Sequence, residues 1–377
     1  MWKMDKEQSL NELAKVFLKL GFTAFGGPAA HIAMMRQEVV TKRRWMSEEH
    51  FLDLIGATNL IPGPNSTEMA IHIGQDRAGW RGLIIAGLCF ICPAVIITLF
   101  FSWLYKQYGQ LPEIQPFIYG IKPAIISIIL MAVYPLSKKS LKTPQLWGIG
   151  FIVLVLSLLG INEFFLLFGA GIMAILFSLI NKQNTIHSLI PVALLQISNP
   201  GFITSKNLHL FLIFLKIGAI LYGSGYVLFA FLDTELVATG LLTRQQLIDA
   251  IAVGQFTPGP VFSSVTFIGY QINGFMGALI STIAIFLPSF VFVALLHPLM
   301  KKMRSSKSLS IFLDAVNVAS IAIIIAVCYE MIKDSIADWR TIFIAVLCFS
   351  LLFRFKNMNS AWIVLLGALL GFTLQYF

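Results

Sequence analysis

A stretch without a single Asp, Glu, Lys or Arg runs from Ala250 to Met300, and Pro258-Gly259-Pro260 interrupts it near its start. Roughly 20 apolar residues are enough for a helix to cross the ~30 Å hydrocarbon core of a bilayer. Pro lacks the N–H that a helix needs, and Gly accepts backbone angles that other residues resist, so this tripeptide breaks the helix. In a bilayer such a break is tolerated only inside protein or beside a wet cavity. We therefore predict an all-α polytopic membrane protein that contains a broken helix.

The composition agrees with this class. Of the 377 residues, 57% are hydrophobic and only 12% are charged, and Gly82–Tyr105 and Asn357–Phe377 are further uncharged stretches. The N-terminus lacks an apolar core followed by small residues, so no cleavable signal peptide is expected. The net charge of +9 is typical of Lys and Arg in cytoplasmic loops, and attraction of anions is an additional interpretation.

A second Pro-Gly-Pro, Pro62-Gly63-Pro64, lies in the other half of the chain in matching surroundings. Phe17–Gly21 resembles Phe214–Gly218, and the offset of the two tripeptides is 196 residues (258 − 62). We call Pro62-Gly63-Pro64 the first break and Pro258-Gly259-Pro260 the second break. Two broken helices at matched positions of two repeats are the usual sequence sign of a transporter's binding site.

The charged loops indicate how the repeats are oriented. The repeats are expected at residues 1–180 and 208–377, with a linker at 181–207 in which a short extra crossing is left open. Lys42-Arg43-Arg44 precedes the first break, and the acidic Asp233-Thr234-Glu235 is interpreted as its counterpart. Residues 106–113 carry little charge, whereas 301–307 are strongly basic. By the positive-inside rule the repeats have inverted topology, and each Pro-Gly-Pro segment is expected to be a re-entrant or discontinuous helix.

Each break is a candidate anion-binding site. A helix that restarts after Pro64 or Pro260 presents free N–H groups and the positive end of its dipole. The candidate substrate-binding residues at the breaks are Asn59, Pro62, Gly63, Pro64, Asn65 and Ser66 in the first half, and Gln255, Thr257, Pro258, Gly259, Pro260 and Ser263 in the second. The alternative is a structural kink whose Asn and Ser side chains cap their own backbone. The matched pair of breaks favours a site.

Small residues mark a second pair of matched positions. Gly26 and Gly27 in the first half correspond to Gly223 and Ser224 in the second. They permit a ligand or a Pro-Gly-Pro loop to approach the backbone closely, and simple helix packing explains them almost as well. We include these four residues in the predicted substrate site.

Ionisable residues in apolar surroundings are the remaining candidates, because such residues usually have a function. The predicted substrate-attracting cations are Lys19, Lys122 and Lys216, and the predicted coupling acids are Glu68, Asp53 and Asp249. Snorkelling to the interface is the alternative for the lysines. Asp53 and Asp249 each lie early in a helix, where a carboxylate stabilises the dipole. Glu68 has no acidic counterpart and is the first candidate for a titrating group, with a salt bridge to Arg77 as the alternative.

Several other classes are excluded. Cys89 and Cys92 have metal-like spacing but lie in an apolar helix without further ligands, so no metal site is predicted. No enzyme signature and no ATP site is present, so we expect neither catalysis nor a cofactor, and transport would run on gradients or on the membrane potential. Gly367 and Gly371 form a GxxxG face, which favours packing within the scaffold and leaves a homodimer open. Expected partners are a small anion and the lipid bilayer, with no nucleic acid.

The combined motifs resemble the chromate ion transporter family in its long-chain, two-repeat form. They are Phe25-Gly26-Gly27-Pro28, Lys42-Arg43-Arg44-Trp45, Pro62-Gly63-Pro64-Asn65, Tyr222-Gly223-Ser224-Gly225 and Gln255-Phe256-Thr257-Pro258-Gly259-Pro260. The resemblance covers nearly the whole chain. It implies a bacterial inner-membrane, multi-pass exporter of chromate that gives chromate resistance, built from oppositely oriented halves.

Electrostatics favours export of a dianion such as chromate, with sulfate as an isosteric competitor. The membrane potential contributes about 2.3 kcal/mol per charge per 100 mV, which is roughly 4.6 kcal/mol for a dianion that leaves an inside-negative cell. Few intramembrane carboxylates are present to carry protons against this term, although Glu68, Asp53 and Asp249 leave proton coupling open. The alternatives are proton-coupled uptake of sulfate or another oxyanion, and an anion channel.

Overall fold

The computed structural model describes residues 6–25, 27–109, 111–180, 206–222, 225–296, 306–355 and 358–374, and every regular element in these ranges is helical, as predicted. The first half contains α1 (Lys6–Thr23), α2 (Pro28–Arg36), η1 (Gln37–Lys42), α3 (Glu48–Thr58), α4 (Asn65–Tyr108), α5 (Gln115–Ser140), α6 (Pro144–Leu158) and α7 (Glu163–Ile180). The second half contains α8 (Lys206–Ile220), α9 (Val227–Leu232), η2 (Asp233–Val237), α10 (Arg244–Phe256), η3 (Val261–Ser263), α11 (Ser264–Leu296), α13 (Lys307–Ser335), α14 (Trp339–Arg354) and α15 (Ser360–Leu374).

The first helix of each half is interrupted at the small residues that the sequence matched. In the first half α1 ends at Thr23, and α2 begins at Pro28, whose missing N–H is not needed in the first turn of a helix. In the second half α8 ends at Ile220 and α9 begins at Val227. Both halves therefore begin with a helix that ends shortly before a second, separate helix.

The helix after each break bends sharply at a matched glycine. In α4 the bend lies at Ala78 and Gly79, where Gly79 has a φ of 62° and a ψ of −150°. In α11 it lies at Asn273 and Gly274, where Gly274 has a φ of 60° and a ψ of −152°. These positive φ values favour glycine. The two arms of α4 touch beside the bend, because a Cβ on Gly74 would lie 2.3 Å from the carbonyl oxygen of Gly82.

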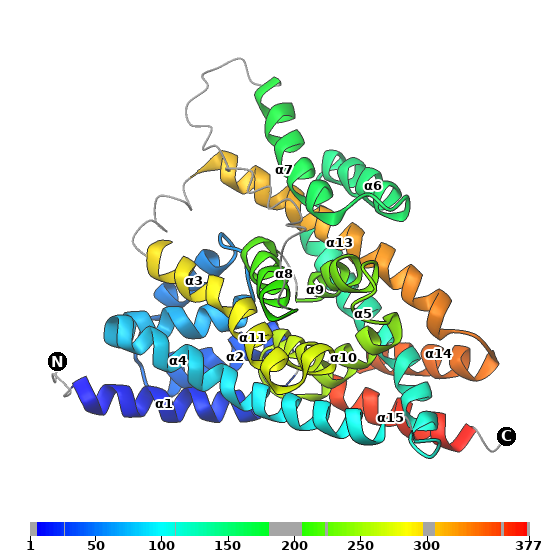
Figure 1. Ribbon diagram of the computed structural model, residues 1–377. Helices are drawn as coiled ribbons and strands as arrows, with labels where there is room; N and C mark the ends of the chain where they lie inside the picture. Colours follow the sequence, from blue (N-terminus) through cyan, green and yellow to red (C-terminus); the bar gives the residue numbers. More distant parts are fainter. Residues whose placement is uncertain are drawn as a thin grey trace.

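The last two helices of each half pack against the other half (Figure 1). Helices α6 and α7 lie against α13, whereas α14 and α15 lie against α5. The α5–α15 contact is a close backbone approach, because a Cβ on Gly120 would lie 2.0 Å from the carbonyl oxygen of Gly367 and 2.6 Å from the Cα of Gly371. The GxxxG face therefore packs within the scaffold, as the sequence favoured.

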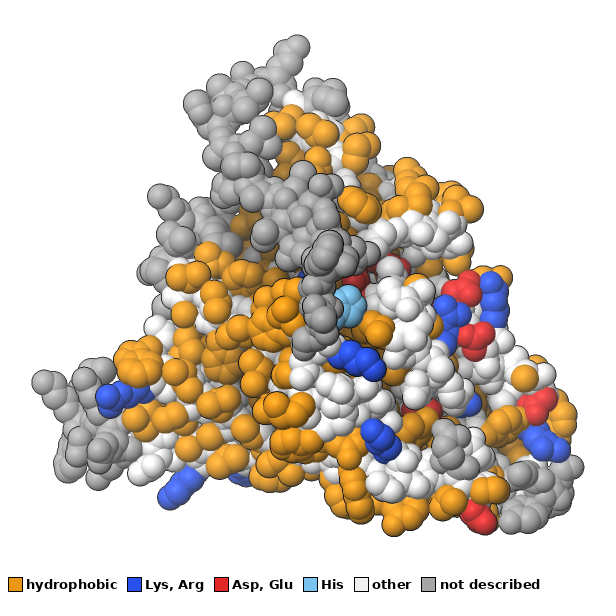
Figure 2. All heavy atoms as spheres, viewed as in Figure 1, with side chains coloured by type: hydrophobic (Ala, Val, Ile, Leu, Met, Phe, Trp, Pro, Cys, Tyr) orange, Lys and Arg blue, Asp and Glu red, His pale blue; other side chains and the backbone are white. Residues whose placement is uncertain are grey.

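Among the described residues, four helices are long and apolar enough to cross a membrane, namely α4, α5, α11 and α13. Their outward side chains are apolar too, and Ile96 and Phe100 of α4 and Phe275 and Leu295 of α11 are well exposed. Figure 2 shows hydrophobic side chains gathered over α4 and α11, with few charges among them. A surface of this kind suits lipid rather than water, and the chain is a multi-pass membrane protein.

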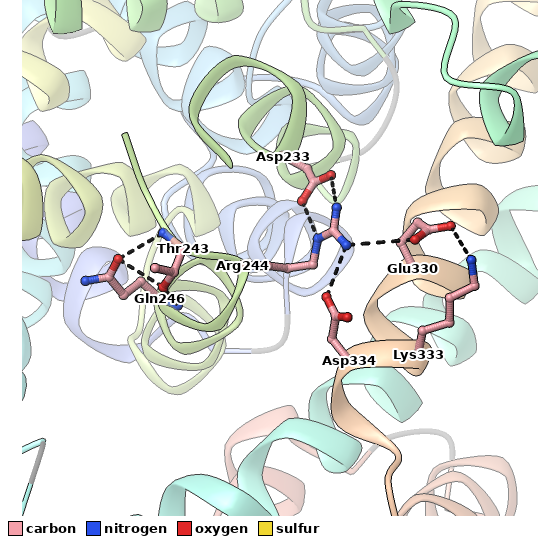
Figure 3. A network of polar contacts seen from close by, with 7 residues as sticks. All are labelled: Asp233, Thr243, Arg244, Gln246, Glu330, Lys333 and Asp334. Carbon is pink, nitrogen blue, oxygen red and sulfur yellow. Dashed lines mark hydrogen bonds and ion pairs between the residues drawn. The ribbon is translucent and has the colours of Figure 1, made fainter. Parts of the chain in front are cut away.

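Ion pairs at the start of α10 tie this helix to two neighbours (Figure 3). Arg244 donates from Nε and Nη2 to the two carboxylate oxygens of Asp233 in η2, at 2.8 and 3.0 Å. Its Nη1 donates to Asp334 of α13 at 3.1 Å. In the first half Arg36 donates to Glu48 at 2.6 Å, at the corresponding place but with the charges exchanged. Each half therefore has an ion pair at this place, with the acidic and basic residues in exchanged positions.

Candidate functional site

Each break of one half is hydrogen-bonded to the interrupted first helix of the other half. The N–H of Gly63 donates to the carbonyl oxygen of Leu221 at 2.8 Å, just after α8 ends. The N–H of Gly259 donates to the carbonyl oxygen of Ala24 at 2.8 Å, just after α1 ends. These two bonds are equivalent under the repeat, because Gly63 matches Gly259 and Ala24 matches Leu221. The structure therefore brings the two breaks into one reciprocal assembly.

Glycine is required at the centre of both breaks. Gly63 has a φ of 135° and Gly259 a φ of 88°, which other residues rarely adopt. Space is also lacking, because a Cβ on Gly63 would lie 2.3 Å from Oε1 of Glu68, and a Cβ on Gly259 would lie 2.9 Å from the Cβ of Ala94. Backbone and side-chain packing therefore both select glycine at these two positions.

The helices that follow the breaks begin without a side-chain cap. Pro64 precedes α4 and Pro260 precedes η3, and neither proline has a side chain that can accept from the first turn. The first N–H groups of a helix have no partner within the helix, and a helix N-terminus attracts negative charge. Both starts therefore leave backbone donors that suit an anion, and the predicted anion site stays a prediction.

The first break is surrounded by polar groups from both halves. Glu68, in the first turn of α4, is fully buried, and Ser289 of α11 donates to its Oε1 at 3.4 Å. Tyr222 lies within electrostatic reach of the same carboxyl group. Further out, Asn65 donates to the side-chain oxygen of Asn59 at 3.0 Å. These two predicted site residues thus lie together at the exposed side of the break.

The second break has hydroxyl groups and no acid at the corresponding positions. Ser264 stands where Glu68 stands in the first half, and its buried hydroxyl has no hydrogen-bond partner among the described residues. Thr98 of α4 donates to the hydroxyl of Ser263 at 3.3 Å. Thr257 donates to the carbonyl oxygen of Val253 at 2.6 Å, within its own helix. The two breaks therefore share a backbone arrangement and differ in their side chains.

The matched lysines form matched ion pairs. Lys19 lies 3.0 Å from Oε1 of Glu38, and Lys216 lies 2.6 Å from Oε1 of Glu235. Their interpretation as substrate-attracting cations stays a prediction, since each ammonium group is held by a carboxylate here. The pairs also correct one alignment of the sequence. Glu235 is the counterpart of Glu38, so the acidic stretch that contains Glu235 corresponds to residues 36–38 and not to the basic loop at 42–44.

Glu38 contacts more cations than its counterpart does. Besides Lys19, Lys42 donates to Oε1 at 2.9 Å and Arg43 donates to Oε2. Burial by itself raises the pKa of the Glu38 carboxyl, but the hydrogen bonds from these three cations lower it to about 2. This cluster lies at the end of α2 rather than in a long apolar helix, and it fixes η1 against α1.

The matched aspartates lie in different surroundings. Asp53 is exposed on α3, whereas Asp249 is buried in α10 and accepts a hydrogen bond from the hydroxyl of Tyr105 at 2.6 Å. Lys122, half-buried in α5, lies within electrostatic reach of Asp249. A helix cap precedes each aspartate: the Ser47 hydroxyl accepts from the N–H of His50, and Thr243 forms a capping box with Gln246 (Figure 3). Asp249 and Lys122 thus form a second polar cluster, away from the breaks.

Some predicted residues lie outside the described part of the chain, and some contacts were not predicted. Gly26, Gly223 and Ser224 fall outside the described residues, as does nearly all of the linker at 181–207. The sequence missed Ser289, although it directly follows Pro288, which is the repeat counterpart of Pro93. Only the backbone is used at Ala24 and Leu221, so no side chain could have revealed these two acceptors.

Comparison with known proteins places this architecture among transporters. A family model described as "Chromate transporter" matches twice, over residues 11–175 and 208–372. A probable chromate transport protein of Synechococcus elongatus is 31% identical, with 96% of this chain and 95% of the relative covered. A chromate transport protein of Cupriavidus metallidurans is also 31% identical, over 96% of this chain and 92% of the relative. An uncharacterized transporter of Methanocaldococcus jannaschii is 28% identical, over 99% and 96%. No solved structure matched the chain.

Proposed function

The chain belongs to the chromate transporter family, and from this premise we propose that it is a secondary transporter that exports chromate. The observation that carries the proposal is the reciprocal docking of the two breaks. The N–H of Gly63 binds the carbonyl of Leu221, and the N–H of Gly259 binds the carbonyl of Ala24. Two uncapped helix starts are thereby held in one assembly, where they offer donors to a tetrahedral oxyanion.

The reciprocal contacts of the two breaks also support an alternating mechanism. Equivalent contacts hold each break against the opposite half, so the assembly has two equivalent ways to open. The low charge of residues 106–113 and the strongly basic residues 301–307 are those expected of repeats inserted in opposite orientations. In inverted repeats of this kind, rocking of one half against the other exposes a central site to each side of the membrane in turn.

The direction of transport follows from the charge of the substrate. A dianion that leaves an inside-negative cell gains roughly 4.6 kcal/mol at 100 mV. The membrane potential therefore favours export, which would confer resistance if it exceeded entry. Sulfate has the same charge and shape, so we expect it to compete with chromate.

Flux into sealed proteoliposomes that contain the full chain tests this proposal. We expect saturable chromate movement that increases with an imposed potential and is inhibited by sulfate. The variants Asn65→Ala and Thr257→Ala, checked for expression and monodispersity, should raise the half-saturating chromate concentration. Flux that does not saturate would indicate a channel, and inward movement against the membrane potential, driven by a proton gradient, would indicate coupled uptake. Absence of movement of either anion would overturn transport of oxyanions altogether.

Orientation is tested separately by labelling the loops at 106–113 and 301–307 from one side of the membrane. Because the repeats are proposed to be inverted, reagents that cannot cross the bilayer should reach only one of these two loops. Labelling of both loops from the same side would exclude inverted repeats and, with them, the alternating mechanism proposed above.

A further inference from the structure

Glu68 is a buried acid that the arrangement of the breaks does not require. Its side chain has no exposed surface, and its Oε2 atom has no hydrogen-bond partner among the described residues. Its Oε1 atom accepts from Ser289 at 3.4 Å, which is a long hydrogen bond. The same oxygen lies so close to Gly63 that a Cβ there would come within 2.3 Å of it. The carboxyl group is therefore directed at the first break itself.

No cation is recorded against this carboxyl group in the described part of the chain. Tyr222 faces it from the end of α8, α11 contributes the Ser289 hydroxyl, and the buried His72 belongs to the same arm of α4. Several ionisable groups on α4 and on the elements packed against it have other partners. Lys19 pairs with Glu38, Arg77 with Glu12, His50 with Asp76 and Tyr105 with Asp249, and His31 of α2 lies against the ring of Phe90.

A carboxylate in this place is unfavourable for two separate reasons. Burial of an ion without a paired charge or a full set of hydrogen bonds is costly, so such groups tend to be neutral. An anion at the start of α4 would also lie beside Glu68, where two negative charges repel strongly because little water separates them. A bound oxyanion and an ionised Glu68 therefore oppose each other, whereas a bound oxyanion and a neutral Glu68 do not.

We propose that Glu68 is a proton-binding site that must be neutral before the first break can hold a divalent oxyanion, so that one proton and one anion cross together. The inference rests on the proposed oxyanion transport and adds its coupling ion. The carboxylate takes a proton from water on the side where the anion enters and returns it to water on the side where the anion leaves. No other bond changes. Ser264 occupies the equivalent place in the second half, so the repeat supplies one such proton and not two.

Binding of chromate to the purified full-length protein tests the inference, over the pH range in which chromate stays a dianion. If one proton must bind with the anion, the wild-type affinity falls about tenfold for each pH unit above the titration of Glu68. Glu68→Gln keeps a neutral side chain of the same size, so it should bind chromate with an affinity that no longer depends on pH. A pH slope in Glu68→Gln equal to that of the wild type would overturn the proposal.

Two further variants keep the test decisive. Glu68→Ser reproduces the second break and should also abolish the pH slope, so it substitutes for Glu68→Gln if that variant does not fold. Ser264→Ala is the matched control at the second break and should retain the wild-type slope, whatever its affinity. Loss of the slope in Ser264→Ala would show that the effect is not specific to Glu68, and would count against the assignment.

Proton movement in proteoliposomes separates this inference from the proposed function. Chromate flux by the wild type should change the internal pH, as read by a trapped indicator dye, and flux by Glu68→Gln should not. Wild-type chromate flux without any proton movement would refute the coupling role of Glu68 and leave transport intact. Absence of wild-type flux would instead refute the proposed function.

Discussion

The first and second breaks differ in their side chains and hardly at all in their backbone. In both, a glycine with a positive φ donates its N–H to a carbonyl oxygen of the opposite half, at 2.8 Å. Glu68 and Ser289 lie around the first glycine, whereas Ala94 lies beside the second, and Ser264 stands at the sequence position that matches Glu68. The backbone contact therefore belongs to the shared fold, and the polar groups that respond to charge and pH belong to one break alone. The two breaks are therefore alike in their backbone, and only the first has an acidic side chain beside it.

Substitution of Gly63 or Gly259 should have the largest effect on chromate flux, and it tests whether the two breaks are equally important. Gly63→Ala and Gly259→Ala each force an alanine into a positive-φ conformation, at a cost of about 1–3 kcal/mol before any clash is counted. We expect chromate flux to fall more than tenfold in both, with a lowered melting temperature in detergent. Gly79→Ala, at a positive φ with open space around it, is the control for strain alone. Flux at the wild-type level in either break variant would show that the docked break is not needed.

Loss of the Glu38 carboxylate should have the next largest effect. Glu38→Gln leaves three neighbouring cations without their anion and should destabilise the protein by about 1–2 kcal/mol, since those cations are partly exposed. Glu235→Gln, with one recorded lysine partner, should cost less. The pKa of Glu38 is lowered to about 2 in the folded protein, against about 4.3 when unfolded. Its stabilisation is thus complete at neutral pH and is lost as the pH falls from ~4 towards 2.

Thermal unfolding in detergent between neutral and acid pH measures this difference. The gap in melting temperature between the wild type and Glu38→Gln should narrow as the acid range is entered. A gap that stays constant across the whole pH range would show that the three cations do not depend on Glu38 for their placement.

Removal of the arginines that carry the sign-reversed pairs comes third. Arg244→Ala breaks a two-pronged bond to Asp233 and a contact to Asp334, and should lower stability by about 1–2 kcal/mol. Arg36→Ala breaks one exposed pair with Glu48 and should have a smaller effect. Exchange of the partners in the double variant Arg244→Asp, Asp233→Arg should recover part of the loss. Equal effects of the two alanine variants would indicate that the pairs contribute alike despite their different burial.

Substitution of Ser289, which lies next to Glu68, should have the smallest effect on chromate flux. It tests most directly how the side chains of the two breaks differ. Ser289→Ala removes the recorded donor to Glu68, which is a change of about 1 kcal/mol or less. We expect a shift in the pH dependence of chromate flux and little change in its maximum. Ala94→Ser places a hydroxyl at the matched position beside Gly259, where no carboxyl group is present, and should not shift the pH dependence. If the wild type, Ser289→Ala and Ala94→Ser all showed the same pH dependence of flux, Ser289 would have no influence on Glu68.

Features encoded within a short stretch of chain were open to prediction. Pro and Gly alter their own backbone whatever surrounds them, so the two breaks were visible in the sequence. The helix caps at Ser47 and Thr243 also involve only residues that are close together in the chain. The matched ion pairs also have a signature in the sequence, because Lys19 and Glu38 have the same separation as Lys216 and Glu235.

Contacts between distant segments were not open to prediction. The acceptors for the two breaks are the carbonyl oxygens of Ala24 and Leu221. Because every residue has a backbone carbonyl, the residue type does not show which one will accept. The partners of α6, α7, α14 and α15 depend on which apolar faces meet, and uniformly apolar helices carry little directional information. The interpretation of Asp233–Glu235 as the partner of the basic loop was wrong because loop charge was compared without knowledge of the ion pairs.

The exchange of terminal helices between the halves has a consequence for biogenesis. Helices α6 and α7 are synthesised long before α13, against which they pack. Helices α14 and α15, which cover α5, are synthesised last. During translation the first half therefore exposes to lipid, or to insertion factors, surfaces that it later hides. Neither half is a complete folding unit, and assembly ends only when α15 reaches Gly120. A chain truncated near its C-terminus should thus lose support in its first half and become a substrate for membrane proteases.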